Sequence, residues 1–215
     1  CEIIRQEVFR LQFLVDSDAL TEDEKQPLRS IMKRAEQPEE IKNSLKTLCT
    51  LLEKHYRQKP ILLIDEYDVP LDKAYAHGYY DQMIDLIRSM FGVALKTNDS
   101  LFFAVLTGCL RVSKESIFTG LNNLKVYSIT DLQCDEYFGF TDTEVRKMLA
   151  DYDLKAHYED TRAWYDGYRF GTQDVYCPWD VINYCDVLRS DPEAEPKAYW
   201  INTSGNELVR RLINK

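Results

Sequence analysis

The chain has 215 residues, of which 45% are hydrophobic, and a formal net charge of -9 at pH 7. This length allows one large domain, or one domain with a small appendage, around a real core. The acidic balance argues against a broad grip on DNA or on an anionic membrane, so a nucleic-acid role is not supported for this segment. The sequence has no apolar run of 18 residues, no signal peptide and no metal-site spacing among its six cysteines, which predicts a cytoplasmic protein with reduced thiols.

Helical periodicity dominates the first 60 residues. Apolar residues at helical spacing predict three helices, over residues 2–14, 27–34 and 38–56. The acidic stretch 16–24 is expected to be mobile. Because the chain opens at Cys1, without a methionine and within a helical pattern, we interpret it as a fragment.

Strands and helices alternate after Pro60. Residues 61–64 and 101–106 are apolar at consecutive positions, which predicts strands with both faces buried, as in a parallel sheet covered by helices. A helix is expected over residues 79–96, and residues 124–129 predict a third, weaker strand. This alternation predicts an α/β fold with a doubly wound sheet.

The chain changes character after residue 130. Short helices and aromatic-rich turns replace strands, which predicts a core of residues 1–130 and a helical subdomain of residues 131–215. The sequence TDTE at 141–144 predicts a helix N-terminus with a capping box, and Pro178 predicts the start of another helix. A last helix is expected from about Gly205 onward.

Two acidic residues follow the first predicted strand directly. In ILLIDEYDVP, residues 61–70, four aliphatic residues lead into Asp65 and Glu66. Beside a bound nucleotide, such an Asp holds a water ligand of Mg²⁺ and such a Glu polarises the attacking water. The alternative is that acidic residues simply mark the point where a buried strand reaches solvent.

The second predicted strand ends in a residue that suits the same site. Ligands bind beyond the carboxyl ends of the strands in such sheets, so Thr107 is expected beside Asp65, within reach of the attacking water or the terminal phosphate. Arg111 is a candidate to stabilise charge on a transferring phosphoryl group. A structural Thr and a solvated surface Arg are the alternatives.

Several stretches closely resemble the bacterial AAA-ATPase-like family. They are IDEYDVPLDKA (64–74), LTGCLRVSKESIFTGLNNLKVYSITD (106–131), FGFTDTEVRKML (138–149), WYDGYRFG (164–171), VYCPWDVINY (175–184) and YWINTSGNELV (199–209). The resemblance implies a partial P-loop NTPase of the AAA+ and related ASCE clades, which uses ATP and Mg²⁺. It also implies a helical lid or winged-helix-like role for residues 131–215.

The resemblance further implies a nuclease-like domain of the PD-(D/E)XK superfamily, often fused in the same polypeptide, and it is compatible with an oligomer. By the same resemblance, Asp65 and Glu66 match the acidic pair that binds Mg²⁺ through water and activates the attacking water. Thr107 matches the sensor position, and Arg111 matches an arginine of the family whose role stays open.

The sequence departs from the family in one large respect. Members begin with a phosphate loop that ends in Gly-Lys-Ser or Gly-Lys-Thr, but none of the eight glycines here is followed by lysine. By resemblance, the chain starts after the second strand of the fold, so LFFAVL and LKVYSI would flank an empty slot. We expect this chain alone to bind ATP weakly or not at all.

Other sequence features carry weaker signals. An E-x-K element of a nuclease is disfavoured at residues 195–197, because Pro196 would break strand pairing. The aromatic residues of WYDGYRFG favour packing of the subdomain over base stacking. Two functions therefore stay open: the core segment of an ATPase that is inactive without its phosphate loop, and a non-catalytic regulatory or protein-interaction module.

Overall fold

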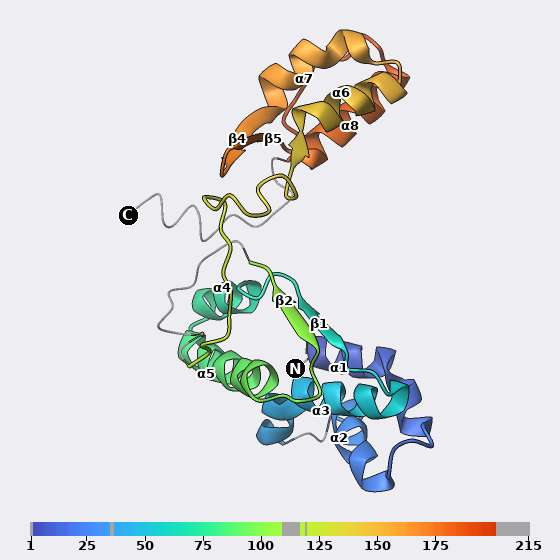
Figure 1. Ribbon diagram of the computed structural model, residues 1–215, viewed down its shortest axis with the longest axis vertical. Helices are drawn as coiled ribbons and strands as arrows, with labels where there is room; N and C mark the ends of the chain where they lie inside the picture. Colours follow the sequence, from blue (N-terminus) through green and yellow to red (C-terminus); the bar gives the residue numbers. More distant parts are fainter. Residues whose placement is uncertain (1, 35–36, 109–116, 119, 201–215) are drawn as a thin grey trace. The chain divides into compact units, whose positions relative to one another are not determined.

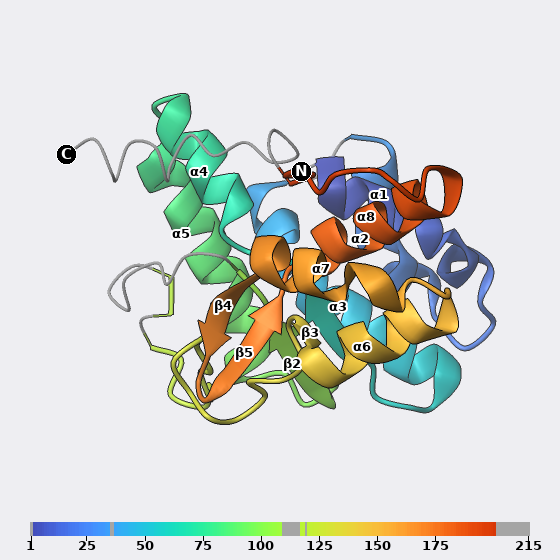
Figure 2. The same cartoon turned by 90° about the horizontal axis from the view of Figure 1, so that it is seen from above.

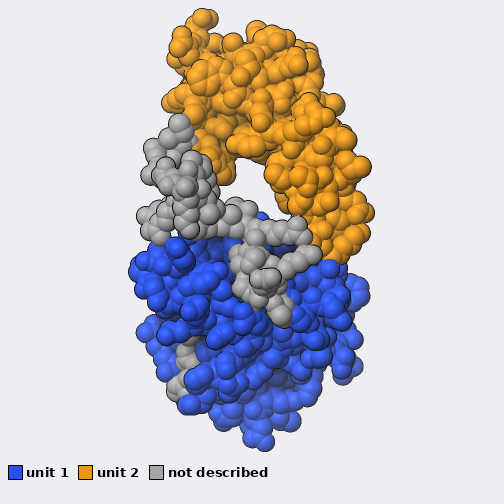
Figure 3. Space-filling model, turned by 90° about the vertical axis from the view of Figure 1, so that its left-hand side faces the viewer, with its two compact units in different colours: residues 1–124 blue, residues 125–215 orange. Residues whose placement is uncertain are grey.

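The computed structural model describes residues 2–34, 37–108, 117–118 and 120–200. The chain divides into two units, residues 1–124 and residues 125–215, which Figure 3 shows in blue and orange. Hydrophobic clusters form separately within each unit. Among the described residues, every helix is too short or too polar to cross a lipid bilayer.

Four helical elements open unit 1. They are α1 (Glu2–Arg10), the 3₁₀ helix η1 (Gln12–Asp16), α2 (Glu22–Met32) and α3 (Pro38–Tyr56). Val8, Leu14 and Leu28 are almost completely buried between them. The bounds expected for α3 are confirmed, and the helix expected over 2–14 divides into α1 and η1.

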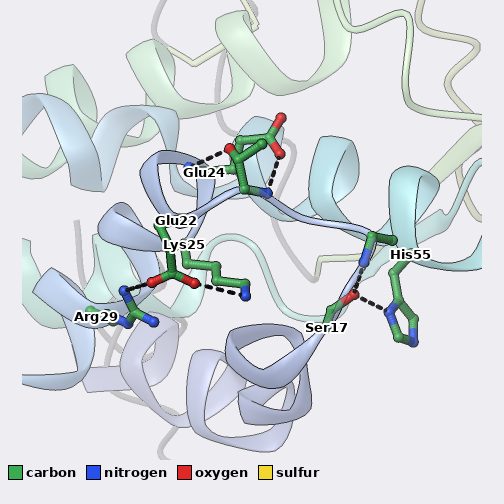
Figure 4. A network of polar contacts seen from close by, with 8 residues as sticks. Ser17, Glu22, Glu24, Lys25, Arg29 and His55 are labelled. Atoms are coloured by element: carbon green, nitrogen blue, oxygen red, sulfur yellow. Dashed lines mark hydrogen bonds and ion pairs between the residues drawn. The ribbon is translucent and has the colours of Figure 1, made fainter.

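Helix α2 begins earlier than its apolar pattern predicts. The Thr21 side chain accepts a hydrogen bond from the Glu24 amide, and the Glu24 carboxylate accepts one from the Thr21 amide. This capping box starts the helix inside the acidic stretch 16–24, so the last three residues of that stretch are helical. Figure 4 shows Glu22 in the first turn bonded to Lys25 (3.0 Å) and Arg29 (2.7 Å).

A two-stranded parallel sheet follows. Strands β1 (Ile61–Ile64) and β2 (Phe103–Leu106) pair in register, with Ile61 opposite Phe103 and Ile64 opposite Leu106. Between them run α4 (Val69–Ala76), α5 (Tyr80–Phe91) and the π-helical turn η2 (Gly92–Lys96). Figure 1 shows α4 and α5 on one side of the strands. The structure is thus α/β with mostly helical content, as the alternation predicts at this coarse level.

One face of this sheet is partly buried and the other is exposed, which corrects the expectation that both would be buried. Leu62, Ile64 and Leu106 pack against the cluster formed by α4 and α5. On the opposite face lie Ile61, Leu63, Phe103 and Val105, and the exposed fraction of Leu63 reaches 73%. Within unit 1, no described element covers that face. Consecutive apolar residues predict burial on both sides only where helices are available for both.

The third strand expected over residues 124–129 is absent. This segment is described and forms no regular structure, and Val126 and Ile129 are exposed. A strand forms only when a neighbouring strand edge accepts its backbone hydrogen bonds, so apolar alternation alone did not suffice here.

Unit 2 contains strands where we expected turns. Its elements are β3 (Phe140–Thr141), α6 (Asp142–Asp151), the 3₁₀ helix η3 (Lys155–His157), α7 (Tyr158–Tyr165), β4 (Asp166–Phe170), β5 (Gln173–Tyr176) and α8 (Pro178–Ser190). The strands form an antiparallel sheet in the order β3-β5-β4, and β4 and β5 lie side by side in Figure 2. Most of WYDGYRFG therefore forms strand β4, where we expected an aromatic-rich turn.

The predicted caps of unit 2 are confirmed, but its aromatic packing is only partly so. Thr141 forms the capping box with Glu144, and Pro178 opens α8. In WYDGYRFG, Tyr165 is buried, whereas Trp164 and Tyr168 are exposed. The helix expected from Gly205 lies outside the described residues.

Asp142 organises the polar part of this core. Its carboxylate accepts hydrogen bonds from the hydroxyls of Tyr158 (2.6 Å) and Tyr176 (2.8 Å) and from Nε of Arg146 (2.7 Å). Partial burial acts to raise the pKa of Asp142, but these three hydrogen bonds outweigh it and lower the pKa to about 2. The carboxylate thus links α6 to α7 and β5.

Candidate functional site

The parallel pairing of β1 and β2 brings the predicted site residues together. Asp65 and Glu66 follow the last residue of β1, and Thr107 follows the last residue of β2. The Thr107 amide donates to the Ile64 carbonyl at 2.9 Å, which extends the ladder by one bond. Because the strands run in the same direction, both chain segments leave the sheet at the same edge.

The Thr107 hydroxyl contacts both acidic residues. It donates a hydrogen bond to Oδ1 of Asp65 and accepts one from the Glu66 amide at 3.3 Å. A hydroxyl has a single proton to donate, so in this arrangement it is committed to the Asp65 carboxylate. Thr107 therefore orients the acidic turn itself.

Glu66 has an uncommon backbone conformation for a residue with a side chain. Its φ is +52°, in the left-handed region. Two further hydrogen bonds hold the turn, from the Tyr67 amide to the Thr107 carbonyl (3.0 Å) and from the Val69 amide to the Glu66 carbonyl (3.1 Å). The side chains of Asp65 and Glu66 are exposed to solvent. The turn thus presents two adjacent carboxylates at the edge of the sheet.

These carboxylates suit a magnesium ion that is mainly held by other ligands. Mg²⁺ typically keeps several waters and takes one or two protein carboxylates together with substrate phosphates. Within the described ranges, no group of three or more His, Cys, Asp or Glu side chains could hold a metal ion by itself. The donor set of Asp65 and Glu66 therefore fits Mg²⁺ only together with water and phosphate oxygens.

Three residues around the turn escaped the sequence reasoning. The Tyr67 ring packs edge-on against Phe118, with ring centroids 5.2 Å apart at 72°. Asp68 is buried, with an exposed fraction of 6%, and its carbonyl accepts the Leu71 and Asp72 amides as α4 begins. Gly108 lies against both, since a Cβ built there would be 2.6 Å from Cε1 of Tyr67. A glycine two residues after the end of a predicted strand was the available signal in the sequence.

Arg111, the remaining predicted site residue, lies outside the described residues.

A serine–histidine pair elsewhere in unit 1 is less suited to chemistry. Oγ of Ser17 lies 2.7 Å from Nδ1 of His55, and the Ala19 amide donates to the same Oγ at 3.2 Å (Figure 4). Such pairs can activate a nucleophile. Ser17, however, has an exposed fraction of only 5%, which closes it to a substrate. The pair joins the end of η1 to α3.

A family model and a relative match this chain. A family model described as "Predicted AAA-ATPase" matches residues 11–118, a range that includes Asp65, Glu66 and Thr107. The chain is also 32% identical, over 159 residues, to an uncharacterized protein encoded in the vnfD 5′ region of Azotobacter chroococcum mcd 1. That alignment covers 74% of this chain but only 30% of the relative, so the chain spans about a third of the relative's length. No solved structure matches.

Proposed function

The chain belongs to the AAA-ATPase-like family. From this premise we propose that it supplies the part of an ATP hydrolysis site that binds Mg²⁺ through water and activates the attacking water. The observation that carries the proposal is the meeting of Asp65, Glu66 and Thr107 at the carboxyl ends of two adjacent parallel strands. In open α/β sheets, this edge is where ligands bind.

Each side chain has a defined role in this proposal. Asp65 holds a water ligand of Mg²⁺, and Glu66 accepts a hydrogen bond from the attacking water and polarises it. Thr107 keeps the Asp65 carboxylate in place through its hydroxyl. Asp65 would hold Mg²⁺ through a water ligand, and the ion would supply positive charge to neutralise the phosphate groups. Arg111 is proposed to stabilise charge on the transferring phosphoryl group, as its place in the sequence suggests.

The phosphate-binding half of the site is proposed to come from outside these 215 residues. None of the eight glycines is followed by lysine, so a phosphate loop of the Gly-Lys-Ser/Thr type is absent from this sequence. The P-loop arrangement of the complete sheet is part of the same proposal. So is an effector domain of nuclease-like fold in the same polypeptide, for which the length of the relative leaves room.

Two measurements test the proposal. In the intact gene product, Glu66→Gln should lower ATP turnover by about 10²-fold or more while ATP binding is kept, because the amide preserves shape but is a poor base. Unchanged turnover would remove Glu66 from the mechanism. In calorimetry, the 215-residue chain should bind Mg-ATP weakly, and a micromolar affinity would contradict the divided site.

A regulatory or protein-interaction module is the second candidate, and the exposed sheet face favours it. Ile61, Leu63, Phe103 and Val105 present apolar side chains on one surface of β1 and β2. Exposed apolar patches of this kind often mark contact sites. If the intact protein neither binds nor hydrolyses ATP, with Glu or with Gln at position 66, the result would support the interaction module over the ATPase.

A further inference from the structure

Gly108 lies in close contact with Tyr67 and Asp68, the two residues that follow Glu66. A Cβ at position 108 would lie 2.6 Å from Cε1 and 2.9 Å from Cδ1 of Tyr67, and 2.9 Å from Oδ1 of Asp68. Distances below about 3 Å are closer than carbon atoms tolerate without displacement. Position 108 therefore has room for glycine but not for a side chain while Tyr67 and Asp68 stay where they are.

Neither neighbour is placed to give way easily. The Tyr67 ring contacts Phe118 edge-on at 5.2 Å, and Phe118 packs in turn against the cluster that fills the space under α4 and α5. Asp68 is buried at the start of α4. A partly buried ring that packs against Phe118, and a buried carboxylate, transmit a displacement to their own backbone.

That backbone is the acidic turn. Tyr67 is the residue next to Glu66, and its amide donates to the Thr107 carbonyl at 3.0 Å. Glu66 has a φ of +52°, which costs an L-residue free energy and persists only where surrounding contacts impose it. Besides the hydrogen bonds of Glu66 itself, the ring of Tyr67, which lies between Gly108 and Phe118, is such a contact on the adjacent residue.

We infer that Tyr67 is a positioning residue for Glu66, and that Gly108 is the position that leaves room for its ring. The expected effect of Tyr67 on ATP turnover rests on the proposed ATPase function. Its expected effect on the backbone conformation of Glu66 does not. The Tyr67 ring fixes the direction of the Glu66 peptide, and so the direction in which its carboxylate leaves the sheet edge. Neither residue contacts substrate in this role.

The backbone part is tested by hydrogen exchange in the intact gene product. Gly108→Ala should speed exchange about tenfold in a peptide that covers residues 65–69, with no change in a reference peptide from α3. Gly92→Ala is the matched control, because a Cβ at Gly92 meets nothing within 4 Å and its φ is helical. Unchanged exchange over residues 65–69 in Gly108→Ala would overturn the inference.

The catalytic part is tested by two variants of Tyr67, which remove atoms and so avoid overpacking. Tyr67→Ala should lower kcat about tenfold or more with little change in KM for ATP, because the loss concerns the orientation of Glu66. Tyr67→Phe keeps the ring and should recover most of the turnover. Equal losses in both variants would overturn the role of the ring.

A double-mutant cycle connects the two positions. If Gly108→Ala acts by displacing the Tyr67 ring, it should reduce kcat far less in the Tyr67→Ala background than in the wild type. Additive losses would overturn the coupling. Glu66→Gln, measured alongside, separates this outcome from failure of the ATPase proposal, since turnover that does not depend on Glu66 refutes the latter alone.

Discussion

The hydroxyl of Thr107 donates a hydrogen bond to the carboxylate of Asp65 across the ends of two parallel strands, from a residue 42 positions away in sequence. The same oxygen accepts the Glu66 amide. One side chain directly after β2 thus contacts both acidic residues that follow β1, and it links the sheet to the proposed catalytic residues.

Thr107→Val should weaken that order while keeping the side-chain shape. The valine leaves the Glu66 amide without this acceptor and Asp65 without this donor, at a cost of about 1 kcal/mol in the free energy of unfolding. Turnover of the intact protein should fall about tenfold or more, as is typical when the partner of a site residue is removed. Thr107→Ser, which keeps the hydroxyl, is the control, and steady-state kinetics with urea unfolding measure both effects. Equal behaviour of Val and Ser would contradict the role of the hydroxyl.

Glu66→Gly should make the protein more stable than Glu66→Gln. The left-handed conformation costs an L-residue about 1–2 kcal/mol, and the greater freedom of glycine in the unfolded chain returns part of that gain, so a net difference of about 0.5–1 kcal/mol is expected. Denaturant unfolding of the two variants measures it. Gly78, with a φ of +78° and open space around it, offers the reverse experiment, since Gly78→Ala should be destabilising by a similar amount. A lower stability for Glu66→Gly would show that the turn stores no strain.

The two faces of the β1–β2 sheet should respond differently to truncation in the 215-residue chain. Leu62→Ala removes a side chain packed under α4 and α5 and should cost about 2–3 kcal/mol. Leu63→Ala, one residue on but 73% exposed, should cost less than about 0.5 kcal/mol. Chemical denaturation of the pair provides the measurement, and similar losses at both positions would mean that the outer face is covered.

Asp142 should make the free energy of unfolding of unit 2 depend on pH in the acidic range. Hydrogen bonds outweigh the effect of burial and lower its pKa from 3.8 to about 2. A carboxylate with a lowered pKa adds stability that is fully present above its ordinary pKa and is lost as the pH falls through the folded pKa. The stability difference between wild type and Asp142→Asn should therefore be constant at neutral pH and shrink between pH 3.8 and about 2. Urea unfolding across this range tests it, and a difference that grows on acidification would reverse the sign of the linkage.

The closeness of Asp65 and Thr107 could be predicted from the sequence, because parallel strands have their carboxyl ends at the same edge of the sheet. The direction of the Thr107 hydroxyl could not, since the rotamer depends on which donors and acceptors meet there in three dimensions. The left-handed backbone conformation of Glu66 and the close approach of Gly108 to Tyr67 could not be predicted either, for the same reason. Neither leaves a pattern in the residue types alone, beyond the presence of a glycine.

The sequence by itself determined the features that depend on neighbours along the chain. Helix α3 and the capping box at Thr141 appear where predicted, because their hydrogen bonds and apolar spacing involve residues within a few positions of one another. Strand β1 also appears where its run of four aliphatic residues predicts it, although its hydrogen bonds are made to the distant β2. Tertiary structure decided which sheet face is buried, that residues 124–129 form no strand, and that residues 166–170 do. These outcomes depend on whether a distant segment is present to cover a face or to pair with an edge, and local residue patterns do not contain that information.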